Sequence, residues 1–162
     1  MELPEATKIR LRTQHLTLEG IIDNLSEQET EMDLLSDKWT IKQQMAHLVR
    51  YQDIFYERIQ TIMTNFNAVF SPYVADEDEK FMVISRLSIS QLLKSLNEKR
   101  DIINTFYFGL NSGELSRKGR HTQLGYFSIA LWAEFFLLHE GHHIYSIFRM
   151  SNQLTQAKGS RA

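Results

Sequence analysis

The chain has 162 residues, a formal net charge of -2 and 43% hydrophobic residues, a composition typical of one globular domain. Its basic and acidic residues are interspersed, which argues against a nucleic-acid partner, and it has no cysteine for disulfides, thiolate metal ligands or a thiol nucleophile. The N-terminus lacks the features of a signal peptide, and no apolar run is as long as a membrane span, which needs about 18 residues. We therefore expect a cytoplasmic protein in which any metal is held by His, Asp or Glu.

Hydrophobic spacing predicts four long amphipathic helices. The first covers residues 5–25 and the second residues 40–63, with Thr40 as its N-cap. A third helix is predicted over residues 88–110 and a last one over residues 126–151. The apolar face of the last helix includes two histidines: Ile129, Trp132, Phe136, His139, His143, Ile147 and Met150.

The segments between these helices are predicted to be irregular. Residues 26–37 and the glycine-dotted, basic residues 111–125 are expected to be loops. Residues 64–79 form a connection long enough to cross from one end of a bundle toward the other, with an acidic, solvated turn at its end. The polar residues 153–162 are expected to be a flexible tail. We predict an all-α protein in which residues 1–152 form one four-helix bundle, and the long connections leave the order of its helices undetermined.

Two histidines of the last helix form the clearest candidate site. His139 and His143 are one helical turn apart and project from the same face, so both imidazoles can bind one metal ion. Together with Glu140 they match the H-E-x-x-H pattern of zinc proteases. Such proteases need a third ligand further along the chain, but no Asp or Glu follows Glu140 and no His follows His143. The protease interpretation is therefore rejected.

The third ligand must then lie upstream, and the candidates are His47, His15, His121 or an acidic residue. His47 is at the edge of the apolar face of the second helix, whereas His15 lies within the face of the first and is more simply a core histidine. His121 lies in a predicted loop, where it is either solvated or folded over one end of the bundle. A set completed by His47 would leave metal positions open to water or substrate, as in catalytic sites.

Arg100 occupies the middle of the apolar face of the third helix. A guanidinium facing a core needs a carboxylate or carbonyl partner, because an unpaired buried charge is strongly unfavourable. Two interpretations remain open. Arg100 either ties two helices together or faces a cavity and binds an anionic group of a substrate.

At this point the sequence resembles the DinB superfamily, which includes DinB-like proteins and bacillithiol-transferase-like enzymes. The resemblance extends over essentially the whole chain and rests on an ordered set of short motifs: Lys38-Trp39-Thr40-Ile41, Ala46-His47-Leu48, Gly119-x-His121, Gly125 and His139-Glu140-x-His142-His143. Each motif is weak by itself, and the order makes the set specific.

The resemblance implies a four-helix bundle with a divalent ion, nickel, zinc or similar, held by His47, His139 and His143. It also implies a homodimer and a small-molecule substrate, and an enzyme that activates water or a low-molecular-weight thiol as a hydrolase or thiol S-transferase. A non-catalytic, stress-related binding module is the alternative. His142 is turned about 100° from His143 and should not share the ion. Glu140, at roughly 60°, is either a hydrogen-bond acceptor or proton carrier beside the ligands, or part of a surface or interhelical salt bridge.

Overall fold

A computed structural model describes residues 2–34 and 39–159 as a bundle of four long helical segments. The first segment is α1 (Glu5–Thr13) and α2 (Thr17–Ile22), joined by the 3-10 turn η1 (Gln14–Leu16). The others are α4 (Ile41–Thr64), α6 (Ile89–Gly109) and α8 (Ile129–Gly159). The prediction of an all-α four-helix bundle is confirmed. No helix of the described ranges is long and apolar enough to cross a bilayer.

The helices begin where their capping residues predict. Thr40 and Gln43 form a capping box at the start of α4, in which each side chain accepts a hydrogen bond from the other residue's backbone N–H. Ser88 and Gln91 form the same box at the start of α6. Because these polar residues satisfy the free N–H groups of the first turn, the predicted starts of both helices agree with the structure.

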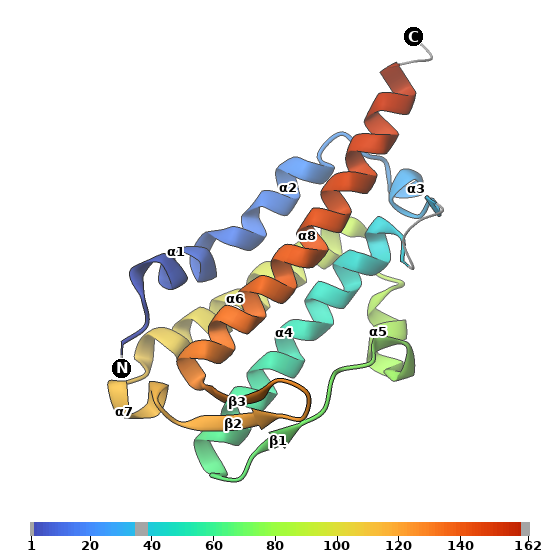
Figure 1. The fold of residues 1–162 in the computed structure, drawn as a ribbon. Coiled ribbons are helices and arrows are strands. Elements are labelled where there is room, and N and C mark those ends of the chain that lie inside the picture. Colours follow the sequence, from blue (N-terminus) through green and yellow to red (C-terminus); the bar gives the residue numbers. More distant parts are fainter. Residues whose placement is uncertain (1, 35–38, 160–162) are drawn as a thin grey trace.

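The order of the helices around the bundle is not sequential. The N-terminal segment and α4 lie on opposite sides of α8, and α6 packs behind them against α4 and α1 (Figure 1). The N-terminal segment and α8 run in one direction, whereas α4 and α6 both run in the other (Figure 1). The chain between α4 and α6 must therefore return along the bundle, as its length predicted. It contains β1 (Val69–Phe70), η2 (Ala75–Glu77) and α5 (Glu79–Ile84).

A small sheet closes one end of the bundle, where the sequence predicted only loop. β2 (Lys118–His121) pairs antiparallel with β3 (Gly125–Ser128) and parallel with β1, and α7 (Ser112–Leu115) precedes it. Gly119 fits against α4 because it has no Cβ, which would lie 2.6 Å from the Ile62 side chain. Gly125 has a φ of 88°. The predicted start of the last helix at residue 126 is wrong, since residues 125–128 are paired in the sheet and α8 begins at Ile129.

Three further segments differ from the sequence prediction. The predicted first helix, residues 5–25, is interrupted by η1 and ends at Ile22. A short helix, α3 (Glu27–Thr30), lies within the predicted loop 26–37, of which residues 35–38 are outside the described ranges. The last helix continues to Gly159, so residues 153–159 are helical where a flexible tail was predicted. Leu154 is buried, and Lys158 binds Glu29 and the Asn24 carbonyl, which holds the last turns against the bundle. The remaining residues of the predicted tail, 160–162, lie outside the described ranges.

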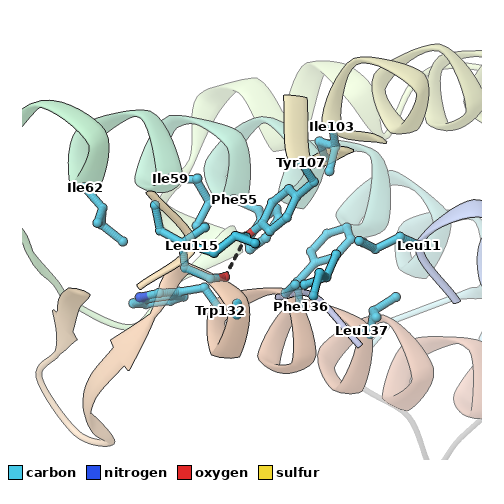
Figure 2. Close-up of a cluster of buried hydrophobic side chains, with 14 of the residues drawn as sticks. Leu11, Phe55, Ile59, Ile62, Ile103, Tyr107, Leu115, Trp132, Phe136 and Leu137 are labelled. Atoms are coloured by element: carbon cyan, nitrogen blue, oxygen red, sulfur yellow. Dashed lines mark hydrogen bonds between the residues drawn. The ribbon is translucent and has the colours of Figure 1, made fainter. Parts of the chain in front are cut away.

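Buried polar residues divide the core into two apolar clusters. Figure 2 shows the cluster nearer the sheet, where the Tyr107 hydroxyl donates a hydrogen bond to the Ile129 carbonyl at 3.0 Å. A second cluster fills the opposite end of the bundle. Between the two clusters, the N-terminal segment contributes the buried side chain of His15, α6 that of Arg100, and α8 those of Glu140 and His143. This polar layer contains the candidate site.

Candidate metal centre

The structure brings His47, His139 and His143 together in the polar layer. His139 and His143 extend from successive turns of α8, and His47 extends from α4, which packs against α8. The Nε2 atom of His139 lies 3.1 Å from Nε2 of His47 and 3.2 Å from Nε2 of His143. One ring nitrogen from each of the three residues falls within 4.8 Å of the others. We refer to these residues as the histidine triad.

Burial keeps the triad uncharged. It lowers the pKa of His47 to about 4, that of His143 to about 3 and that of His139 to about 2. The neighbouring imidazoles lower the pKa of His139 and His143 further, whereas the Asp76 carboxylate acts in the opposite direction on His47. All three side chains are therefore neutral near pH 7, which is the form that binds metal ions.

One member of the triad is held in a defined tautomer. The Nδ1 atom of His143 lies 2.5 Å from Oε1 of Gln44. Because an amide oxygen only accepts hydrogen bonds, the proton of His143 is on Nδ1 and its Nε2 carries a lone pair toward His139. A proton on Nε2 of His139 could form a hydrogen bond with Nε2 of His47 or with Nε2 of His143, but not with both. The Nδ1 atoms of His47 and His139 are buried without a partner among the described residues.

The donor set fits a divalent ion. Two nitrogens bound to one ion at about 2.0–2.1 Å are separated by about 2.9 Å at a right angle and by about 3.4 Å at the tetrahedral angle. The observed separations of 3.1 and 3.2 Å fall within this range. An ion would accept the converging lone pairs that the protein leaves without a donor.

Aromatic side chains surround the triad and fix the orientation of its rings. The Tyr51 ring stacks on His139 with a centroid separation of 3.8 Å, and the Trp39 ring packs 4.8 Å from that of His47. Trp39 also stacks on His143 at 6.0 Å. These contacts bury His47 and His143, whereas His139 remains partly exposed.

A cavity of about 220 Å³ lies beside the exposed side of the triad. His139 forms one wall, and Tyr51, Arg58, Tyr73 and His121 contribute to the others. Of the triad, His139 lines the cavity. A larger hollow of about 560 Å³ lies elsewhere on the surface and includes no histidine of the triad, so we assign no role in the site to it.

His121 is folded over one end of the bundle, which is the second of the two alternatives that the sequence left open. It is buried at the end of β2, and its Nδ1 atom accepts a hydrogen bond from the backbone N–H of Gln123 at 3.3 Å. Burial and the nearby Arg58 charge lower its pKa. The residue lines the cavity but does not belong to the triad.

Glu140 and Arg100 form a buried ion pair between α8 and α6. One Glu140 oxygen accepts from Arg100 and the other accepts from Gln14 Nε2 at 3.0 Å. Arg100 also donates to the Leu11 carbonyl and to Nδ1 of His15. Of the alternatives that the sequence left open, the structure shows the interhelical salt bridge for Glu140 and the helix-tying role for Arg100. His15 is a core histidine whose pKa is lowered by burial to about 4.

The charged residue that the sequence analysis missed is Arg58. It lies 11 residues after His47 on α4, and Tyr51 lies four residues after His47. At about 100° per residue, both positions fall on nearly the same helix face as His47. This spacing was the signal in the sequence that could have identified Arg58 as a neighbour of His47. The prediction that His142 lies on another face than the triad is confirmed, since His142 is exposed.

Comparisons with known proteins agree with this architecture. A search of curated proteins found no match. Among solved structures, YfiT from Bacillus subtilis, described as a probable metal-dependent hydrolase with an unusual four-helix bundle topology, has a TM-score of 0.79 and 17% identity, covering 93% of this chain and 87% of YfiT. An uncharacterized protein from Clostridium difficile 630 has a TM-score of 0.68 and 13% identity, covering 94% of this chain and 95% of that one. A protein from Streptococcus pneumoniae has a TM-score of 0.69 and 13% identity, covering 96% and 92%.

Identities this low establish a shared fold and nothing about activity. The sequence itself matches the model of the DinB superfamily over residues 10–147, which includes all three residues of the triad. The protein therefore belongs to the DinB superfamily.

Proposed function

We propose that the protein is a metal-dependent enzyme in which His47, His139 and His143 hold one divalent ion and a small molecule reacts in the adjacent cavity. The observation that carries this proposal is the convergence of three neutral imidazole nitrogens beside that cavity. A bound divalent ion would lower the pKa of a water molecule or a thiol and so supply a nucleophile near neutral pH. Imidazole ligands suit zinc and nickel alike.

Hydrolysis is the reaction that we propose first. The related fold of YfiT, described as a probable metal-dependent hydrolase, supports water as the nucleophile. A small thiol is the alternative nucleophile, which would make the enzyme a thiol S-transferase. In both cases the protein orients the ligands, with Gln44 holding the His143 ring and Tyr51 packing on His139.

Metal analysis of single-ligand variants tests the ligand set. The protein and its variants His47→Gln, His139→Gln and His143→Gln would be stripped with a chelator, reloaded with zinc or nickel, and analysed by elemental mass spectrometry. His142→Gln is the matched control, because it removes an exposed imidazole from the same helix. We expect about one ion per chain in the wild type and the control. Each triad variant should retain substantially less, because loss of one of the three imidazole ligands weakens binding of the ion.

Two results would contradict the proposal. Near-stoichiometric metal in all three triad variants would refute the ligand assignment. A melting temperature that does not change on chelation would also contradict it, since an ion at 100 times its dissociation constant stabilises the folded state by about 2.7 kcal/mol. If neither water nor thiols gave turnover with the metal-loaded protein, the binding-module alternative would be favoured.

A further inference from the structure

Arg58 differs from the other buried cations of the described chain. Four Lys or Arg side chains are buried in the described ranges. Three of them are paired with carboxylates: Lys42 with Glu27 and Glu31, Arg50 with Asp78, and Arg100 with Glu140. Arg58 is only 8% exposed, and in the described part of the chain it makes one hydrogen bond, from Nη2 to the Ser71 carbonyl at 2.6 Å.

Arg58 lines the cavity beside the triad, and it also borders a second hollow of about 390 Å³ that includes Glu57 and Glu77. Its guanidinium packs over the rings of Phe70 and Trp132, with distances of 5.6 and 5.9 Å to their centroids, and lines the cavity wall near His139. The Nε and Nη1 atoms have no acceptor among the described residues and are not fully buried. A buried guanidinium without a carboxylate is unfavourable, and an anion in the cavity would remove this imbalance.

The rest of the cavity provides neutral polar groups and aromatic walls. Because Nδ1 of His121 accepts from the Gln123 backbone, the proton of the neutral ring is on Nε2, which is left as a donor. Tyr51, Tyr73 and Phe135 supply aromatic surface. A single cation, neutral donors and aromatic walls match a single negative charge on an apolar body. A phosphate, with more charge and more acceptors, would need a larger set of donors.

We propose that this cavity binds a small organic acid, with the carboxylate held by Arg58 and by Nε2–H of His121 and the apolar body packed against Tyr51 and Phe135. The assignment rests on the proposed function and names the substrate class of the same site. Arg58 is a binding residue, and it places the rest of the acid next to His139.

Binding of benzoate to the metal-free protein tests the assignment, with isothermal titration calorimetry as the measurement. Chelation removes any direct contact of the carboxylate with a metal ion. Benzamide serves as the neutral analogue of benzoate, and inorganic phosphate as the competing anion. We expect benzoate to bind the wild type, and both benzamide and phosphate to bind more weakly. Loss of a hydrogen-bonded charge partner should weaken benzoate binding roughly 10- to 100-fold in Arg58→Gln.

Two further variants separate the charge of Arg58 from its effect on folding. Arg120→Gln is the matched control, because Arg120 is an exposed cation on β2 outside the cavity, and its benzoate affinity should equal that of the wild type. Arg58→Lys keeps the charge and should bind benzoate more tightly than Arg58→Gln. If Arg58→Gln does not fold, the comparison of benzoate with benzamide in the wild type decides.

Benzoate affinity that is unchanged in Arg58→Gln, or equal affinities for benzoate and benzamide, would overturn the proposal. Tighter binding of phosphate than of benzoate would overturn the choice of a carboxylate. These results are independent of the metal, since the titrations use chelated protein. Failure of the triad to bind an ion would leave the benzoate result unchanged, and Arg58→Gln should retain its full metal content.

Discussion

The substitution Glu140→Gln distinguishes a structural role of this side chain from the catalytic role that the H-E-x-x-H pattern suggests. Glu140 and Arg100 are 1% and 0% exposed, and their ion pair joins α8 to α6. Glutamine keeps the size of the side chain but leaves the Arg100 charge without a carboxylate. Removal of one partner of a buried ion pair destabilises a protein by about 3–5 kcal/mol. We expect Glu140→Gln to lower the free energy of unfolding by this amount.

Urea denaturation followed by circular dichroism measures the change. Glu134→Gln is the matched control, because it removes a carboxylate from the same helix whose ion pair with Arg10 is about one-third exposed, at 33% and 37%. Such pairs contribute only about 0.2–1 kcal/mol. Combining Arg100→Met with Glu140→Leu should recover much of the loss, since an apolar pair leaves no buried charge.

The reasoning would be refuted if Glu140→Gln were as stable as Glu134→Gln. It would also be refuted if Glu140→Gln kept its stability and lost turnover, because Glu140 would then act in the reaction and not in the bundle. Metal content is the second measurement. We expect it to be unchanged per folded molecule, since neither Glu140 oxygen is bonded to the triad.

Three further predictions concern the triad and its surroundings. In the unfolded chain the triad histidines take up protons below about pH 6.5, whereas in the folded chain they stay neutral down to about pH 4. The metal-free protein should therefore lose stability as the pH falls between these values, by up to about 4 kcal/mol per pH unit for three histidines. Urea denaturation at several pH values measures this change, and a free energy of unfolding that does not vary with pH would contradict it. Gln44→Leu removes the acceptor of His143 and should weaken metal binding about 10- to 100-fold in competition with a chelator, and an unchanged affinity would contradict the role of this contact. Gly119→Ala should destabilise the protein by about 1–3 kcal/mol in thermal melts, because the new Cβ would overlap the Ile62 side chain. In the control Gly20→Ala the new Cβ meets no atom within 4 Å, so this variant should not be destabilised. Equal melting temperatures for the two variants would contradict the close packing of Gly119.

The four helices were predictable because each extends over many residues of regular apolar spacing and two of them begin at clear capping residues. The sheet was not, because its strands have two to four residues, too few to show alternation. Its pairing also joins Val69 to Arg120, which are distant in the sequence. The last helix was predicted too short, because the contacts that hold its end, such as Lys158 with Glu29, are made with the N-terminal part of the chain.

Part of the candidate site could likewise be predicted from the sequence, and part depends on how the helices pack. The i, i+4 spacing places His139 and His143 on one face of a helix, which is a local property that the sequence alone determines. His47 entered as one upstream candidate among several and was selected by the resemblance, and its distance to His139 is set by the packing of α4 on α8. Arg58 could be placed on the face of His47 from spacing, but its lack of a carboxylate could not.

The sequence by itself determined the helical class of the protein and the pair of histidines at its centre, because both follow from periodicities within single helices. Only the tertiary structure decided the partners of the buried charges. Glu140 is paired with Arg100 and Arg58 is left facing a cavity, although nothing near either residue in the sequence distinguishes these outcomes. The physical reason is that the free energy of a buried charge depends on groups from other helices, which only the packing of the bundle brings within bonding distance.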